Sequence, residues 1–436
     1  MSHLDARSAR HRYLILLGLR WLPTGMLIPL LALLPLSRGL TLSEVGMAAA
    51  IQGVVVLALE LPTGGLSDSL GRRPVLLLAG LLSLTSLTLL FFAHSFLAFA
   101  TAFAVQGVFR ALDSGPLEAW YVDAAIADDP EADISRGLSG GGAVLGLAVA
   151  AGGLLAGGLI AWDPLAAVDA LALPVLAAGA AQLVSLVALA ALLTEVREAK
   201  GWRATVTSVK QVPTVIGGAV RLLRRSRVLT ALVAVELFWG FGMVTFETLM
   251  PVRLTEVTGG AEQAAALMGP AASAAWVASA AGAATAALVG RRFGLAVGAA
   301  SMRVLQGVTV AGMAMFAGPV GVIAAYLATY VVHGAANPLH QTLLHHQVSG
   351  THRSTVVSLN SMVSQPAGSL GLVTLTALAG ASSVTTAMLV GAVVLAVAAP
   401  LYLPAHRSES DRPRLPTSVE PPARAATAPH RPDASA

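Results

Sequence analysis

Apolar runs of about 20 residues recur along the whole chain, and short polar joints separate them. Such a run is long enough to cross the roughly 30 Å hydrocarbon core of a bilayer as a helix. Backbone groups in lipid must be satisfied within the segment, and the runs are too long for barrel strands. The pattern predicts an all-α polytopic membrane protein with twelve transmembrane helices, over residues 13–35, 41–62, 74–94, 96–124, 138–161, 165–193, 228–250, 264–289, 295–316, 319–346, 354–379 and 382–403.

Composition supports this interpretation, because 56% of the 436 residues are hydrophobic and only 11% are charged. The chain contains no Cys, which excludes disulfides, thiolate metal sites and cysteine nucleophiles. A pI of about 9.8 could suggest nucleic-acid binding, but no folded basic domain exists to carry it, so we expect no nucleic-acid partner.

The basic residues fall on alternate joints, which sets the orientation. The joints and ends on one side carry Arg7, Arg10, Arg12, Arg72, Arg73, Arg136, Arg291, Arg292, Arg353 and the basic tail, whereas the other side carries only Arg38 and Arg253. The positive-inside rule therefore predicts that both termini are cytoplasmic. The polar N-terminus lacks a signal-peptide pattern, so the first run is expected to remain as a span of a plasma (inner) membrane protein.

A weak internal repeat predicts two halves. Pro116-Leu117 returns as Pro338-Leu339 after 222 positions, Arg136 returns as Arg353 after 217, and the Arg pair at 72–73 returns at 291–292. Ordered matches at similar offsets imply two pseudo-symmetric six-helix bundles, an arrangement found in transporters that bind substrate between the halves.

The repeat and the joints divide the chain into four parts. These are an N-terminal bundle at 1–193, a cytoplasmic linker at 194–227, a C-terminal bundle at 228–404 and a tail at 405–436 that we expect to be disordered. The linker has eight Lys or Arg residues, which fits either a plain connection or a segment that lies on anionic lipid.

The joint between the second and third spans reads GGLSDSLGRRP, at 64–74. Gly64, Asp68, Gly71, Arg72 and Arg73 resemble the signature of the major facilitator superfamily at this position, while Ser69 stands where a basic residue is typical. The resemblance extends over residues 10–404. It implies the major facilitator fold and secondary active transport of a small molecule by alternating access, with no cofactor and no enzymatic activity.

The charges of this joint suggest a gate. Asp68 is well placed to face a helix N-terminus, which the resemblance suggests belongs to the eleventh span. Arg72 can bind a carboxylate, and Asp123 at the end of the fourth span is the natural candidate. Such contacts would form in one state and break in the other. A positively charged turn without a switching role remains the alternative.

Ionisable and polar side chains inside the spans are the candidates for a substrate or proton pathway. They are Arg20, Arg110, Asp113, Glu118, Glu236, Glu247, His333, Asn337 and His340. Most lie on spans 1, 4, 7 and 10, which the resemblance implies line a central cavity.

Several expectations follow for these groups. Arg110 and Asp113 are three residues apart and can pair. Asp113 and Glu236 are the expected proton carriers, while Glu118 and Glu247 would meet only water or headgroups. His333, Asn337 and His340 share one helical face, and polar packing between helices is the alternative to a substrate or proton role. No metal site is expected.

The fifth span is rich in Gly and is similar to a motif of proton-coupled exporters, although its Pro is missing. We therefore expect a monomeric transporter that exports a small lipophilic or drug-like molecule in exchange for protons. An uptake carrier for a polar metabolite remains open, as do two other classes, a membrane-embedded enzyme and a non-transporting receptor.

Overall fold

The computed structural model describes residues 4–64, 66, 70–165, 167–194, 214, 217–218, 221, 223–224, 226–347 and 353–410. The described first half contains α1 (Ala6–Leu27), α2 (Leu33–Ser37), α3 (Leu42–Gly64), α5 (Arg72–Phe92), α6 (Phe96–Asp113), α7 (Pro116–Asp128), α8 (Ile134–Trp162) and α9 (Leu173–Leu192). The second half contains α11 (Arg227–Val244), a π-helical turn η1 (Thr245–Leu249), α12 (Met250–Thr258), α13 (Ala261–Phe293), α14 (Leu295–Met315), α15 (Pro319–His346), α16 (Arg353–Ala381), α17 (Val384–Val397), η3 (Ala399–Tyr402) and α18 (Leu403–Ser410).

Within the described residues, eleven helices are long and apolar enough to cross a membrane, and the prediction of an all-helical polytopic protein is confirmed. Several of these helices begin where the sequence supplies a cap. The side chains of Ser95, Asp133 and Ser226 accept hydrogen bonds from backbone N–H groups at the starts of α6, α8 and α11. Such caps satisfy N–H groups that have no partner inside the helix.

Several predicted boundaries differ from the structure. The first span divides into α1 and α2, because turns occupy residues 28–32 around Pro29, whose ring nitrogen cannot donate. The sixth span begins at Leu173 rather than 165. The expectation of disorder from residue 405 is wrong for the start of the tail. α18 continues to Ser410, and the Glu409 carboxylate accepts a hydrogen bond from the Ala296 N–H at the start of α14 (3.3 Å).

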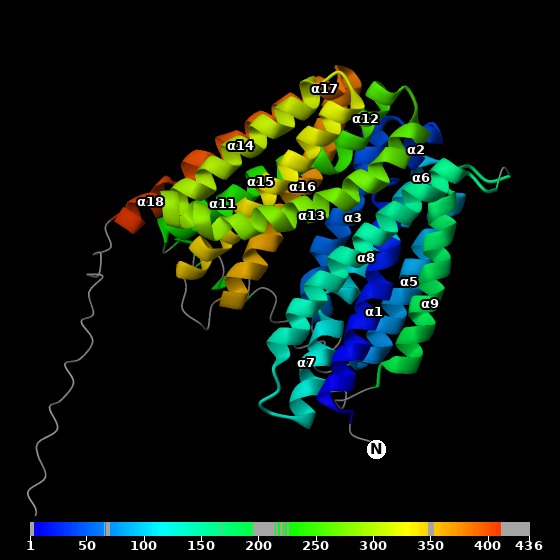
Figure 1. Cartoon of the computed structure of the whole chain (residues 1–436), viewed down its shortest axis with the longest axis horizontal. Helices are drawn as coiled ribbons and strands as arrows, with labels where there is room; N and C mark the ends of the chain where they lie inside the picture. The colour runs from blue at the N-terminus through cyan, green and yellow to red at the C-terminus, as the bar shows by residue number, and fades with distance from the viewer. Residues whose placement is uncertain are drawn as a thin grey trace, which may run out of the picture.

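The two halves meet at one end and diverge at the other (Figure 1). Across the halves, α8 packs against α13, and α3 packs against α16. One apolar core continues through both halves where they meet, including Met26 and Ile160 from the first half and Leu249 and Met268 from the second. At the diverging ends, each half has a separate core instead. The N-terminus and α18 lie toward those diverging ends (Figure 1).

Helix lengths support the internal repeat. α5 and α14 both contain 21 residues and start 223 positions apart, and α8 and α16 both contain 29 residues and start 219 apart. The Arg pairs are not equivalent, however, because 72–73 open α5 while 291–292 close α13. The true counterparts are Gly71 and Gly294, which precede α5 and α14 with φ of 91° and 84°.

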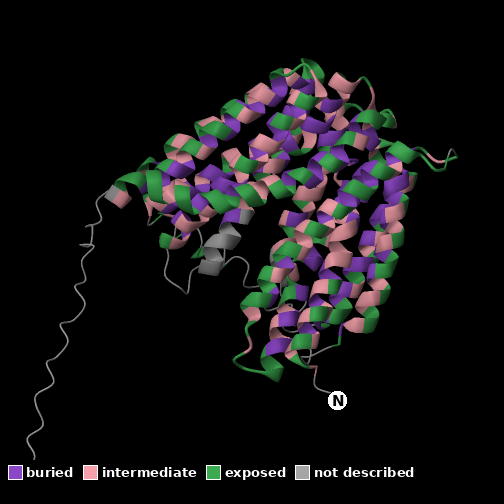
Figure 2. Ribbon diagram, in the orientation of Figure 1, coloured by how far each residue is buried: buried purple, intermediate pink, exposed green. Residues whose placement is uncertain are grey.

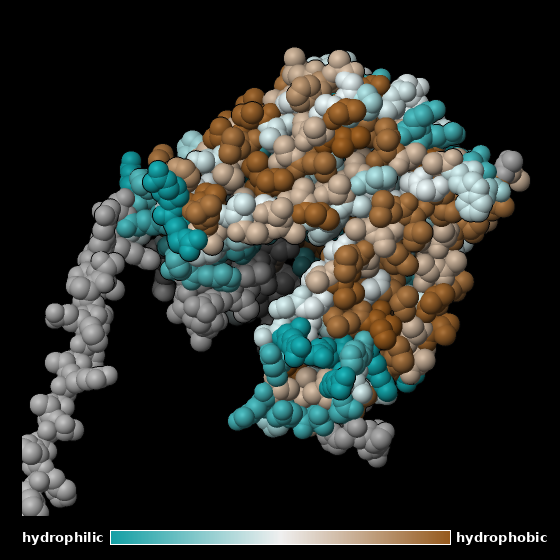
Figure 3. Space-filling model, viewed as in Figure 1, coloured by the Kyte–Doolittle hydropathy of each residue, from teal (hydrophilic) through white to brown (hydrophobic). Residues whose placement is uncertain are grey.

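The outer surface is suited to lipid. Exposed and partly exposed residues predominate on the visible flanks of the helices, while the buried residues concentrate inside each half (Figure 2). Hydrophobic side chains cover the flanks between hydrophilic tips (Figure 3). Large exposed apolar residues on these helices include Phe92, Leu97, Val187 and Val320. An apolar surface of this extent marks a membrane-facing protein.

Candidate functional site

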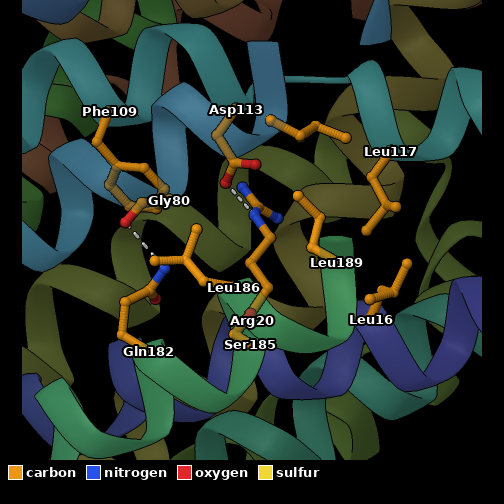
Figure 4. Close-up of a pocket in the computed structure, with 11 residues that line it drawn as sticks. Leu16, Arg20, Gly80, Phe109, Asp113, Leu117, Gln182, Ser185, Leu186 and Leu189 are labelled. Atoms are coloured by element: carbon orange, nitrogen blue, oxygen red, sulfur yellow. Dashed lines mark hydrogen bonds and ion pairs between the residues drawn. The ribbon is translucent and has the colours of Figure 1, made fainter. Parts of the chain in front are cut away.

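The first half buries one ion pair in its interior. The Arg20 Nε of α1 donates to Oδ2 of Asp113, the last residue of α6 (Figure 4). The Asp113 side chain is 3% exposed, while that of Arg20 is 25% exposed. Nearby, the Gln182 amide of α9 donates to the backbone oxygen of Gly80 (3.2 Å). A buried carboxylate is costly unless it is paired, and Arg20 supplies the compensating charge.

The predicted pairing of Arg110 with Asp113 is wrong. Asp113 faces α1, whereas Arg110 is exposed and interacts electrostatically with Glu60 of α3. The fourth predicted span breaks after Asp113, because Gly115 has φ of 93° and Pro116 begins α7. Asp113 therefore ends one helix and Glu118 lies in the first turn of the next, where it is exposed.

The second half buries a larger polar cluster. The Glu236 Oε1 atom of α11 lies 3.2 Å from Nε2 of His340 on α15. The His340 Nδ1 atom is 2.9 Å from the Tyr402 hydroxyl, and Arg303 of α14 donates to Gln306 (2.9 Å). Glu236, His340 and Arg303 are 5%, 1% and 3% exposed. The cluster holds a carboxylate, a guanidinium and an imidazole in a water-poor interior.

This cluster retains unused hydrogen-bonding capacity. Arg303 Nε, Gln306 Nε2 and Asn360 Oδ1 are buried atoms without a hydrogen-bond partner among the described residues. Unsatisfied polar atoms in a buried network are costly, and these three are able to form hydrogen bonds with water or another polar group.

A second polar group lies farther along the seventh predicted span. Glu247 occurs in the π-helical turn η1 and accepts a hydrogen bond from the Tyr330 hydroxyl of α15 (2.5 Å). The expectation that Glu247 meets only water or headgroups is therefore wrong. The wide π turn rotates it toward α15 instead, and such turns are frequent at functional sites.

Between the halves, α8, α13 and α15 line an open cavity of about 400 Å³. Small and apolar side chains line most of it, including Gly146, Leu147, Trp276 and Val277. Of the predicted pathway residues, His333 and Asn337 line this cavity. His340 does not, because it is buried against Glu236 and Tyr402. The three residues predicted to share one helical face therefore have different surroundings. His333 and Asn337 line the cavity, whereas His340 lies in the interior of the bundle.

The candidate gate is described in part. Arg72 Nη2 lies 2.7 Å from Asp123 Oδ2, so the predicted ion pair is present. Gly71 has φ of 91°, a conformation that favours glycine, and the Arg73 Nη2 donates to the Ala190 carbonyl at the end of α9 (2.8 Å). Gly64 ends α3. Asp68 and Ser69 lie outside the described residues, so their role in gating stays a prediction.

Sequence reasoning missed Gln306, Asn360 and Tyr402, which complete the polar cluster of the second half. Gln306 and Asn360 interrupt otherwise apolar spans, a usable signal, but nothing in the sequence marks Tyr402 as the partner of His340. In the described residues, no group of three or more His, Cys, Asp or Glu side chains is arranged to hold a metal ion.

Two helical bundles that meet at one end and line a cavity between them, with charged groups buried in each, define the class of secondary membrane transporters. The sequence profile of the Major Facilitator Superfamily matches residues 13–372. The chain belongs to this superfamily, whose members are transporters and not enzymes. None of the curated protein sequences compared with the chain matches it.

Solved structures agree on the fold. The nucleoside transporter NupG superposes with a TM-score of 0.73 at 12% identity, covering 90% of this chain and 98% of that one. A bacterial homolog of the human lysosomal transporter Spinster, in an inward-facing and unoccupied conformation, superposes with a TM-score of 0.72 at 15% identity, covering 93% and 98%. A structure of proton dependent oligopeptide transporters gives 0.68 at 12% identity, covering 92% and 99%. At these identities, the likeness shows the fold alone.

Proposed function

We propose that this superfamily transporter exports small lipophilic molecules across the plasma (inner) membrane in exchange for protons. The observation that carries the proposal is the lining of the cavity between the halves. Its wall is formed mainly by Gly, Ala, Leu, Val and Trp, with His333 and Asn337 among its few polar groups. Apolar walls with a few placed polar groups suit a lipophilic ligand better than a sugar or another polar metabolite.

Proton coupling is proposed for two buried carboxylates. Asp113 and Glu236 each lie inside one half, next to a basic group, and neither lines the cavity between the halves. Protonation would release Arg20 in the first half or change the Glu236–His340 contact in the second. Either event alters the charge balance of a buried network, which biases a two-state structure.

The proposed direction of transport is compatible with the arrangement of the two halves. If both termini are cytoplasmic, the diverging ends of the halves face the cytoplasm (Figure 1). The structure would then represent the state that receives substrate from the cytoplasm or the inner leaflet.

The test uses inside-out membrane vesicles from a strain without its own drug pumps. Vesicles that contain the chain, acidified inside, should accumulate lipophilic fluorescent compounds, and an uncoupler should abolish the accumulation. The panel should contain cationic, neutral and anionic compounds of similar size. Accumulation of a polar metabolite in right-side-out vesicles, with no lipophile moved in either orientation, would show an uptake carrier instead.

A further inference from the structure

Five aromatic rings form a continuous cluster beside Glu247. The Trp239 and His333 rings stack with centroids 5.5 Å apart, and Tyr330 contacts both His333 (6.3 Å) and Phe246 (5.7 Å). Tyr326 lies edge-on to Tyr330 at 4.9 Å. The rings come from α11, η1 and α15, so the packing of the seventh and tenth predicted spans builds the cluster.

The cluster has a buried layer and an accessible layer. Phe246 and Tyr326 are each 2% exposed and support the other rings from behind. Trp239, Tyr330 and His333 are partly exposed, and Glu247 is exposed. His333 also lines the cavity between α8, α13 and α15, which connects the cluster to the space where substrate is proposed to bind.

Glu247 has no cationic partner among the described residues. Its contact there is the Tyr330 hydroxyl, and the described ion pairs do not include it. Arg303, which interacts electrostatically with His333, is buried and is balanced by Glu236. An accessible carboxylate next to partly exposed ring faces, with no basic partner among the described residues, leaves a place for a positive charge.

We propose that Glu247 and the rings of Trp239, Tyr330 and His333 bind the charged group of a lipophilic organic cation. Aromatic faces attract quaternary ammonium and similar cations within about 6 Å of the ring centre. The carboxylate adds direct charge neutralisation, and the apolar cavity beyond His333 accepts the hydrocarbon part. This inference rests on the proposed export function and specifies its substrate class.

The test measures binding to the purified full-length chain of two ions with the same shape, tetraphenylphosphonium and tetraphenylborate. Tetraphenylphosphonium should bind, and tetraphenylborate should not compete with it. Glu247→Gln and Tyr330→Leu should each weaken tetraphenylphosphonium binding on the order of tenfold or more. Glu256→Gln is the matched control, because Glu256 is an exposed carboxylate of α12 that pairs with Arg253 (2.7 Å).

Thermal stability and size-exclusion profiles must match the wild type before binding is compared. If a variant fails this criterion, tetraphenylphosphonium binding is measured in Tyr330→Phe and Trp239→Leu instead. Tyr330→Phe should lose less affinity than Trp239→Leu, because it keeps its aromatic ring. Wild-type affinity in Glu247→Gln, or equal binding of both ions, would overturn the inference. If the vesicles export neutral or anionic lipophiles while tetraphenylphosphonium does not bind, the inference is wrong and the export function stands. If tetraphenylphosphonium binds but no compound is exported, the export function is wrong.

Discussion

The contact between α8 and α13 should control which state the transporter occupies. At this contact, Gly153 and Gly157 of α8 face Gly269 of α13, and the Ser273 hydroxyl donates to the Ala150 carbonyl (2.6 Å). A Cβ added at Gly157 would lie 2.7 Å from the Ala266 carbonyl oxygen, and one added at Gly269 would lie 2.2 Å from that of Gly153. Both clashes are with backbone atoms, which cannot rotate away.

The size of the effect follows from these distances. Ordinary contact requires about 3.4 Å, so the helices must separate by roughly 0.7 Å in Gly157→Ala and about 1.2 Å in Gly269→Ala. Overpacking of this kind costs about 1–3 kcal/mol, which corresponds to a roughly 5- to 150-fold shift between two states. Gly269→Ala should therefore shift the population more strongly than Gly157→Ala, toward the state in which this end is open.

Spin-label distance measurements can test whether Gly269→Ala shifts the population more than Gly157→Ala. The natural chain has no Cys, so Phe92→Cys and Phe316→Cys provide a single labelled pair without background. These residues are 69% and 48% exposed and lie where α5 and α14 end. The longer-distance population should grow from wild type through Gly157→Ala to Gly269→Ala.

Gly158→Ala is the matched control, because a Cβ at the adjacent residue of the same helix meets nothing within 4 Å. It should give the wild-type distribution. Identical distributions in all four proteins would refute the idea that backbone contact at this end holds the halves together.

Three further predictions concern the gate, the proton and a helix cap. Asp68→Asn and Asp123→Asn should each reduce vesicle transport at least about tenfold at unchanged expression, because each removes a carboxylate proposed to stabilise one state. Normal transport in both variants would show that the joint at 64–74 is a turn without a switching role. Glu236→Gln should abolish transport driven by a proton gradient but keep substrate counterflow, and loss of both would indicate a structural role instead. A hydrogen bond from Ser135 lowers the pKa of Asp133 in the folded protein below its ordinary 3.8. The ionised N-cap therefore stabilises the fold above pH 3.8, and this stabilisation is lost as the pH falls through the pKa of the folded state. The melting temperature of Asp133→Ala should lie below that of the wild type at pH 7 and approach it near pH 3, and a constant difference would contradict this account.

The apolar pattern predicted most of the fold because bilayer thickness and backbone hydrogen bonding leave few choices for a long apolar run. The break at Gly115-Pro116 has a local cause, because a glycine with a positive φ precedes a proline that lacks an N–H. The π turn at Thr245–Leu249 was not predictable, because its residues TFETL carry no breaker and its register depends on packing against α15.

Side-chain partners were harder to predict than helices. The pair Arg72–Asp123 was predicted because Arg72 lies at the start of the third predicted span and Asp123 lies at the same end of the fourth. Arg110 was assigned to Asp113 by sequence distance alone, yet Arg20 reaches Asp113 from α1, 93 positions away. Spacing within one helix shows which residues can meet, but the neighbouring helix decides which contact forms.

The distribution of polar contacts suggests why the halves can move. Every ion pair between described residues lies within one half, including Arg20–Asp113 and Glu236–His340, which are the most buried. Breaking such a pair in a water-poor interior would cost several kcal/mol, so each half should move as a unit.

Across the halves, the contacts are of another kind. Besides the shared apolar core, they are close approaches of glycine backbones and single hydroxyl hydrogen bonds, such as those of Ser273 to Ala150 and Ser369 to Ala50. Each hydrogen bond of this type contributes only about 1 kcal/mol in a membrane. With ion pairs inside the halves and uncharged contacts between them, one bundle could rock against the other without breaking a described ion pair, as alternating access would require.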